Sequence, residues 1–428
     1  MNETPNTASQ DRHVVAPSFR DAFRFWLKLG FISFGGPAGQ IAIMQSELVE
    51  KRKWIEQTHF LHALNFCMLL PGPEAQQLAI YIGWLLHKIR GGIVAGVLFV
   101  LPSIFILCAL SFIYIAFGNI PWIAAIFYGL KPAVLAIVAV AVIRIGRKAL
   151  KSAAMWAIAA AAFVAIYFFH IPFPLIIVSA GIIGFIIGKT RNERSTSTPH
   201  AFGPTLSLGR ALKICALSIF AWWLPIVLAG IFLGTQHTIF REGIFFSKAA
   251  LVTFGGAYAV LPYVSQQAVE TYQWLAPGQM LDGLGLAETT PGPLIMVLQF
   301  VGFVGAWNHP GNLPPLLSAT LGALITTWVT FAPCFLWIFI GAPYLEKLRD
   351  NKLLSATLST VTAAIVGVIL NLAVWFGLHV LFPPNGGIDW FAVAICAAAF
   401  IAMLRYKIDI IPVVLASGLL GVIYKLAF

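Results

Sequence analysis

Two short strings, Phe34-Gly35-Gly36-Pro37 and Leu70-Pro71-Gly72-Pro73, interrupt the first apolar stretches of this chain. Glycine and proline together end a helix, because proline lacks a backbone N–H and glycine adopts conformations that other residues avoid. Each arm beside a break holds about 12 residues, or ~18 Å of helix, which is roughly half a bilayer. The strings therefore predict broken helices in place of continuous spans.

Both strings recur 220 residues further on, as Phe254-Gly255-Gly256 and Pro291-Gly292-Pro293. At this offset residues 25–73 align without a gap, and beyond them the offset grows to 231, where Pro102 meets Pro333. The shared residues are rich in glycine and proline, and composition alone does not explain so many identities. The chain therefore contains an internal duplication. The identical positions of the first copy are Phe25, Lys28, Phe34, Gly35, Gly36, Val49, Glu50, Trp54, Leu61, Leu64, Pro71, Gly72 and Pro73.

The composition is that of a membrane protein. Of 428 residues, 59% are hydrophobic and only 10% are charged, whereas soluble domains carry about 25% charged residues. Too few polar residues are present to cover a soluble surface. The net charge is +11, but the basic residues lie in short loops between apolar runs, where they set topology. We therefore expect a lipid bilayer as the surroundings and no nucleic-acid partner.

The apolar segments predict an all-α integral membrane fold of about 13 segments. A unit of six segments starts and ends on the same side of the membrane. One additional crossing between two such units places the second unit upside down, so the halves become inverted repeats. The expected parts are a cytoplasmic tail (1–20), a first repeat (21–188), a cytoplasmic linker (189–212), a linking helix (213–234) and a second repeat (235–428). The segments are 23–46, 59–87, 91–117, 121–143, 152–169, 172–188, 213–234, 243–265, 279–307, 313–341, 353–381, 389–404 and 408–427.

Basic loops set the expected orientation, because they prefer the cytoplasm. The linker is rich in arginine, which places it inside, with the amino terminus cytoplasmic and the carboxyl terminus external. If segments 23–46 and 59–87 crossed fully, the cluster Lys51-Arg52-Lys53 would be external. If both are re-entrant hairpins, the cluster is cytoplasmic, and we favour this alternative.

The four breaks are the expected binding site. Broken helices at membrane depth line a cavity or are buried in protein, and the amino termini of half-helices bind anions through free N–H groups and the helix dipole. Glycine and proline are also frequent in ordinary membrane helices, but four matched breaks favour a functional role. The expected binding glycines are Gly35, Gly36, Gly72, Gly255, Gly256 and Gly292, and the helix-breaking prolines are Pro37, Pro71, Pro73, Pro291 and Pro293.

Three lysines are candidates for binding an anion, since ionisable residues within a membrane are costly and often functional. Lys28 and Lys248 each precede a Gly-Gly break by seven residues. Both also lie near segment starts, where a lysine extends to the interface without any such role. Lys131 lies deeper, and its counterpart in the second half is Thr362, so this charge is asymmetric.

Two carboxylates lie beside the Pro-Gly-Pro strings, Glu74 directly after the first and Glu288 before the second. A carboxylate that changes protonation between inward and outward states couples proton flow to substrate flow. The alternative is a structural pair with a lysine or a backbone cap. Gln76 and Thr290 would add neutral hydrogen bonds to a bound anion.

No nucleotide loop, nucleophile elbow or zinc motif is present in the sequence. We expect that the protein is not an enzyme and that it binds no cofactor or metal. The absence of a nucleotide site argues against a primary pump.

The combined motifs resemble the chromate ion transporter family in its long, two-domain form. They are Phe34-Gly35-Gly36-Pro37, Leu70-Pro71-Gly72-Pro73, Phe99-Val100-Leu101-Pro102-Ser103, Thr253-Phe254-Gly255-Gly256 and Glu288-Thr289-Thr290-Pro291-Gly292-Pro293. The resemblance covers nearly the whole chain, although Ala257 stands where the first copy has Pro37. It implies proton-driven efflux of chromate across the bacterial cytoplasmic (inner) membrane, and chromate resistance. The residues alone indicate a secondary anion transporter.

Other functions stay open at this point. The substrate is chromate, sulfate or another oxyanion, and the direction is export or import. A membrane-embedded enzyme that acts on lipid phosphate also has re-entrant hairpins, but no nucleophile and base stand near the breaks. A passive anion channel is opposed by Glu74 and Glu288.

Overall fold

The computed structural model describes residues 17–34, 36–190, 208–342, 352–383 and 387–427. Every regular element in these ranges is a helix, which confirms the predicted all-α class. Seven of the described helices are long and apolar enough to cross a membrane, and three shorter apolar helices accompany them. Gly35, most of the predicted tail and most of the predicted linker lie outside the described residues.

The first Gly-Gly string separates α1 from α2, and the first Pro-Gly-Pro string separates α3 from α4. α1 has 14 residues and α2 has 10, whereas a helix needs about 20 to cross a bilayer. The predicted breaks are therefore present in this half. Its elements are α1 (Phe19–Ile32), α2 (Gly36–Gln45), η1 (Ser46–Lys51), α3 (Gln57–Cys67), α4 (Glu74–Phe117), α5 (Pro121–Ala149), α6 (Ala153–Phe169) and α7 (Phe173–Thr190).

The second half repeats this order, with breaks between α9 and α10 and between α11 and α12. Its elements are α9 (Thr238–Val252), α10 (Ala257–Ser265), η2 (Gln266–Thr271), α11 (Pro277–Thr289), η3 (Leu294–Met296), α12 (Val297–Asn308), α13 (Pro315–Gly341), α15 (Lys352–Leu381), α16 (Trp390–Arg405) and α17 (Ile410–Ala427).

α4 is two helices joined by a reversal of the chain. Lys88 has φ 55°, and a Cβ added to Gly83 would lie 2.4 Å from the carbonyl oxygen of Gly91. This reversal lies where one predicted apolar segment ends and the next begins. α12 and α13 form the matching pair, in which a Cβ on Gly322 would lie 2.5 Å from the carbonyl oxygen of Gly302.

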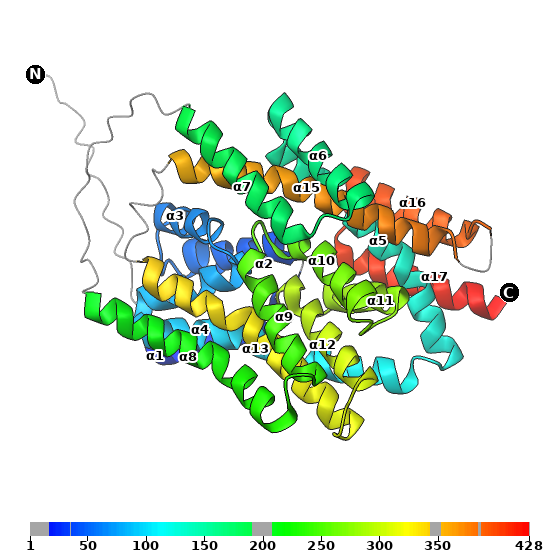
Figure 1. Ribbon diagram of the computed structural model, residues 1–428, viewed down its shortest axis with the longest axis horizontal. Helices are drawn as coiled ribbons and strands as arrows, with labels where there is room; N and C mark the ends of the chain where they lie inside the picture. The colour runs from blue at the N-terminus through cyan, green and yellow to red at the C-terminus, as the bar shows by residue number, and fades with distance from the viewer. Residues whose placement is uncertain (1–16, 35, 191–207, 343–351, 384–386, 428) are drawn as a thin grey trace, which may run out of the picture.

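The two halves interlock. α5 packs against α16 and α17, and α15 packs against α6 and α7. In Figure 1, α15 runs beside α6 and α7, while α5 runs with α16 and α17. α5 and α15 also contact each other, and α1 packs on α4 as α9 packs on α13. Matching elements thus make matching contacts, and each half completes the packing of the other.

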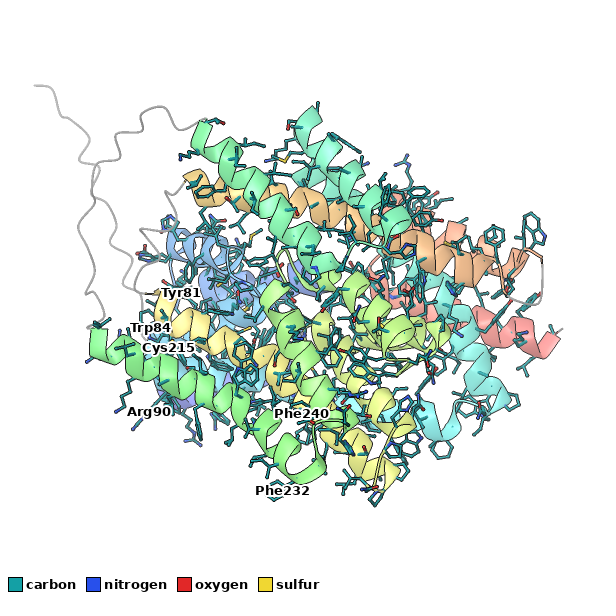
Figure 2. The ribbon with its side chains drawn as sticks, in the orientation of Figure 1. Tyr81, Trp84, Arg90, Cys215, Phe232 and Phe240 are labelled. Atoms are coloured by element: carbon teal, nitrogen blue, oxygen red, sulfur yellow. The ribbon has the colours of Figure 1, made fainter. Side chains whose placement is uncertain are left out.

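α8 (Leu208–Leu233) joins the halves and has no counterpart in either. It lies on the outside of the bundle, against α9 and α13 (Figure 1). Phe240 of α9 contacts Gly230 of α8, whereas Phe232 is 78% exposed and points away from the bundle (Figure 2). A largely exposed apolar helix is suited to lipid contact.

Candidate functional site

Each Pro-Gly-Pro break is hydrogen-bonded to a Gly-Gly break of the other half. The backbone N–H of Gly72 donates to the carbonyl oxygen of Thr253 over 2.7 Å, and that of Gly292 donates to Ser33 over 2.7 Å. Ser33 and Thr253 follow α1 and α9, and each hydroxyl donates to a carbonyl four residues back. The four breaks therefore meet in two pairs, each built by both halves.

Glycine is required at both Pro-Gly-Pro centres. Gly72 has φ 120° and Gly292 has φ 105°, which side chains with a Cβ rarely adopt. A Cβ on Gly72 would lie 2.9 Å from Sγ of Cys334, and one on Gly292 would lie 1.8 Å from Oγ of Ser103. Ser103 also donates to the carbonyl oxygen of Pro291 over 2.6 Å. Side chains of α4 and α13 thus close over the backbone of the opposite half.

Three buried amide side chains lie near the breaks. Gln40, Gln76 and Gln77 are at most 1% exposed, and each donates through Nε2 to a backbone carbonyl. The Oε1 atom of each has no hydrogen-bond partner within the described residues. Buried polar atoms are usually satisfied by protein, water or ligand, so Gln76, which the sequence predicts as a ligand contact, retains bonding capacity.

A cavity of about 760 Å³ reaches the break at Gly72 and Gly255. The exposed Lys148 and Lys151 line the same cavity. A basic surface thus leads to backbone at two helix breaks, which is an arrangement that attracts anions. Polar side chains on this cavity are His62, Asn65, Ser152, Ser355, Ser359 and Thr362.

Glu74 lies in the first turn of α4 and lines this cavity. A Cβ on Gly256, the N-cap of α10, would lie 3.2 Å from Oε1 and 3.4 Å from Oε2 of Glu74. The carboxyl group therefore lies at the amino terminus of α10, where free N–H groups and the helix dipole favour negative charge. An oxyanion would be favoured at the same position, so it would compete with the ionised side chain.

Glu288 lies in a closed environment. Its side chain is 4% exposed and accepts a hydrogen bond from the hydroxyl of Tyr258. Thr290 is 5% exposed and donates to the carbonyl oxygen of Ala287 over 3.1 Å. Neither Glu288 nor Thr290 lines the larger cavity. The two carboxylates predicted to carry protons thus differ, since Glu74 lines the cavity and Glu288 is enclosed.

Lys131 forms an ion pair with Asp282, with 3.5 Å between Nζ and Oδ2. The hydroxyl of Tyr114 donates to the same oxygen over 2.8 Å. Lys131 also lines a second cavity of about 460 Å³, together with Tyr128 and Lys425. Its positive charge is therefore compensated in this conformation, and it lies on a different cavity from Glu74.

The other predicted lysines are both exposed. Lys28 on α1 and Lys248 on α9 line neither of the two cavities, and their exposure fits side chains that extend to an interface. Of the Gly-Gly strings, Gly36 has φ 66° and Gly256 has φ 94°, so both use conformations that favour glycine.

Sequence reasoning missed three buried or partly buried polar residues. Asp282 lies within the predicted segment 279–307. It could have been found from the sequence, because an ionisable residue at membrane depth is rare and often functional. Glu242 lies one residue before the predicted segment 243–265. Tyr114 had no signal, since its partner Asp282 is 168 residues away in the sequence.

Membrane-spanning helices with breaks in the core of the bundle define a polytopic transmembrane transporter. The chain belongs to the Chromate transporter family, which matches residues 20–185 and 240–422. This finding confirms the resemblance drawn from the sequence motifs. The matched ranges cover the two halves and exclude α8.

The curated relatives match along most of their length. A chromate transport protein of Cupriavidus metallidurans is 27% identical over 434 residues, which cover 98% of this chain and 97% of the relative. One of Pseudomonas aeruginosa is 31% identical over 415 residues, with coverage of 94% and 92%. An uncharacterised transporter of Methanocaldococcus jannaschii is 26% identical, with 98% of both chains covered. These relatives are transport proteins, which confirms the prediction of a transporter over an enzyme. No solved structure matches the chain.

Proposed function

We propose that this protein exports chromate from the bacterial cytoplasm across the inner membrane by proton-coupled secondary transport, and thereby confers chromate resistance. The cavity that leads from Lys148 and Lys151 to Gly72, Glu74 and Gly255 carries this proposal. Chromate is a tetrahedral dianion, which suits backbone N–H groups at helix amino termini and lysine side chains. The family and the names of the relatives support chromate as the substrate.

The two cavities fit the proposed inverted repeats. Lys131 and Tyr128 of the smaller cavity correspond, at the offset of 231, to Thr362 and Ser359 of the larger one. With the amino terminus cytoplasmic, the larger cavity opens to the cytoplasm and the smaller one to the outside. In an alternating cycle one cavity widens as the other closes, and the ion pair of Lys131 with Asp282 holds the external cavity narrow.

Glu74 and Glu288 are the proposed proton carriers. Glu74 exchanges protons with the cytoplasm through the larger cavity, whereas Glu288, bonded to Tyr258, exchanges after the protein reorients. Exchange of exported chromate for entering protons requires that the anion-free protein is protonated when it returns from the outward-facing to the inward-facing conformation.

One observation favours a second candidate function. Ionised Glu74 at the amino terminus of α10 repels a dianion, and protonated Glu74 admits it. Binding of proton and anion together is the electrostatic pattern of symport, as expected of an importer of sulfate or a similar oxyanion. The vesicle experiment below separates export by exchange from import by symport.

The test uses proteoliposomes in which the purified protein is reconstituted with its cytoplasmic face outward, as in inverted vesicles. A dianion responds to voltage, with about 2.3 kcal/mol per charge for each 100 mV, so the membrane potential is clamped to zero with equal potassium and an ionophore. An acid lumen then drives chromate accumulation by exchange, whereas an alkaline lumen drives it by symport.

Accumulation with the acid lumen supports the proposed exporter, and accumulation only with the alkaline lumen replaces it with the symporter. Equal uptake under both gradients contradicts proton coupling. Excess sulfate in the same assay tests selectivity, because the two dianions share charge and shape. Gradient-driven uptake of sulfate itself, measured with labelled sulfate, would make sulfate a substrate in its own right.

A further inference from the structure

Glu242 is a buried carboxyl group that the proposed transport cycle does not yet use. It lies in the second turn of α9, its side chain is 0% exposed, and neither Oε1 nor Oε2 has a hydrogen-bond partner within the described residues. An isolated ionised carboxylate removed from water is very costly, and such a group becomes neutral or acquires a partner.

The carboxyl group fits into a slot between two glycines. A Cβ added to Gly305 of α12 would lie 2.8 Å from Oε1, and one added to Gly322 of α13 would lie 2.7 Å from Oε2. The same Cβ on Gly305 would lie 3.0 Å from Cβ of Trp274. The slot exists only because both helices carry glycine where α9 crosses them.

Within the described residues, no buried Lys or Arg lies on the helices packed against α9. The imidazoles at the ends of α9 and α12, His237 and His309, bond to the backbone carbonyl oxygens of Pro310 and Gln273. α12 and α13 contain no Asp, Glu, Lys, Arg or His within residues 297–308 and 315–341, and the only titratable groups of α10 are the phenol hydroxyls of Tyr258 and Tyr263. On α9 itself, Arg241 and Lys248 are exposed, and Arg241 bonds to Gln236. The basic residues of α8, Arg210 and Lys213, are in its first turns, and Glu270 and Tyr272 follow α10.

The slot is also unsuited to a metal ion. Metal cations take several oxygen ligands, and the described residues contain no group of three or more His, Cys, Asp or Glu side chains that could hold one. A proton needs only the carboxyl group itself.

The first half shows that this packing does not need a carboxyl group. Position 22, which is 220 residues before Glu242, is alanine and is 4% exposed. α1 packs on α4 there as α9 packs on α13. One copy of the duplicated contact therefore carries a titratable group that the other copy does without.

We propose that Glu242 is a proton-binding site whose protonated form holds α9 against α12 and α13. Loss of the proton to water produces a charge that this slot does not accommodate, so α9 must separate from the glycines. α9 leads to Thr253, whose carbonyl accepts the N–H of Gly72, at a distance along the helix of ~16 Å. Protonation at Glu242 therefore biases the break at the larger cavity, and this last step rests on the proposed proton coupling.

Infrared difference spectroscopy of the purified protein tests the site directly. At a pH at which exposed carboxylates are already ionised, the spectrum of wild type minus Glu242→Gln contains the C=O stretch of a protonated carboxyl group. Above the midpoint of titration the band falls about tenfold per pH unit, and added chromate shifts that midpoint. Glu270→Gln removes an exposed carboxylate from the same half and serves as the matched control, with no such band.

Dicyclohexylcarbodiimide, which reacts with protonated carboxyl groups in apolar surroundings, gives a second readout that needs no variant. Mass spectrometry of the labelled wild-type protein locates the adduct on the peptide that contains Glu242, with labelling that declines as the pH rises. A carboxyl band or adduct that is absent at every pH overturns the proposal. So does a band that neither pH nor chromate changes, because it would mark a permanently neutral structural acid.

The outcome is separable from that of the transport proposal. If vesicle flux proves independent of protons while Glu242 titrates, the proton-binding site stands and its link to transport is wrong. If flux depends on protons while Glu242 does not titrate, coupling resides at Glu74 and Glu288 alone.

Discussion

The ammonium group of Lys131 on α5 lies 3.5 Å from the carboxylate of Asp282 on α11, and this pair joins the two halves of the chain beside the smaller cavity. Asp282 is 5% exposed and Lys131 is 32% exposed. The aspartate thus depends on the lysine and on Tyr114 for compensation of its charge.

Replacing Lys131 with methionine should destabilise the protein, because it leaves the Asp282 charge buried without a cation. We expect a loss of about 2 kcal/mol, below the 3–5 kcal/mol of a fully buried pair since Lys131 is partly exposed. Thermal unfolding in detergent measures it. The double variant Lys131→Met/Asp282→Asn should regain the stability, and if it also regains chromate flux, Lys131 does not bind the anion.

Alanine at the Pro-Gly-Pro centres should affect the two halves unequally. In Gly292→Ala the new Cβ would lie 1.8 Å from Ser103, whereas in Gly72→Ala it would lie 2.9 Å from the movable ends of Cys334 and Gln77. Both variants also incur backbone strain of roughly 1–3 kcal/mol. We expect no flux from Gly292→Ala and reduced flux from Gly72→Ala, measured against the amount of folded protein.

Gly209→Ala is the control for these glycine variants, because among the described residues nothing beyond its own helical turn lies within 4 Å of the added Cβ. Combining Gly292→Ala with Ser103→Gly should restore part of the folded protein. An equal effect of Gly72→Ala and Gly292→Ala would contradict the role assigned to the Ser103 contact.

Glu74→Gln should tighten oxyanion binding and remove its pH dependence. The neutral amide no longer competes with the anion at the amino terminus of α10, so we expect about tenfold tighter chromate binding at alkaline pH. Equilibrium binding to the purified protein at two pH values provides the measurement. Glu50→Gln, which removes an exposed carboxylate in the same half, should bind as wild type does. Weaker binding by Glu74→Gln would show that the carboxyl group contacts the substrate favourably.

Glu50 and Glu270 are exposed counterparts at the offset of 220 residues, and they should face opposite sides of the membrane. Each is replaced singly by cysteine and treated with a membrane-impermeant maleimide in whole cells and in inverted vesicles. Inverted repeats with cytoplasmic 51–53 predict labelling of Glu50→Cys only in vesicles and of Glu270→Cys only in cells. The labelling of wild-type protein measures the reaction of the native cysteines and is subtracted as background. Labelling of both variants from one side would mean that the repeats are parallel.

The sequence predicted the breaks well, because glycine and proline act on the backbone locally. The offset of 220 residues also indicated which breaks correspond, although the hydrogen bond from Gly72 to Thr253 is evident only in the folded structure. Rotation of a helix about its axis was not predictable. Lys28 and Lys248 have the right distance from the breaks along α1 and α9, yet both side chains are exposed. Partnerships such as Tyr114 with Asp282 depend on tertiary packing and leave no local pattern.

The packing of α5 against α16 and α17 has a consequence for biosynthesis. α5 ends at Ala149, whereas α16 begins at Trp390, so the ribosome completes α5 long before its partners exist. During that interval lipid or an insertase must cover the face of α5 that the last two helices will occupy. A chain released early, just before α16, would leave that face open, so a stop codon near the end of the gene exposes the first half to proteolysis.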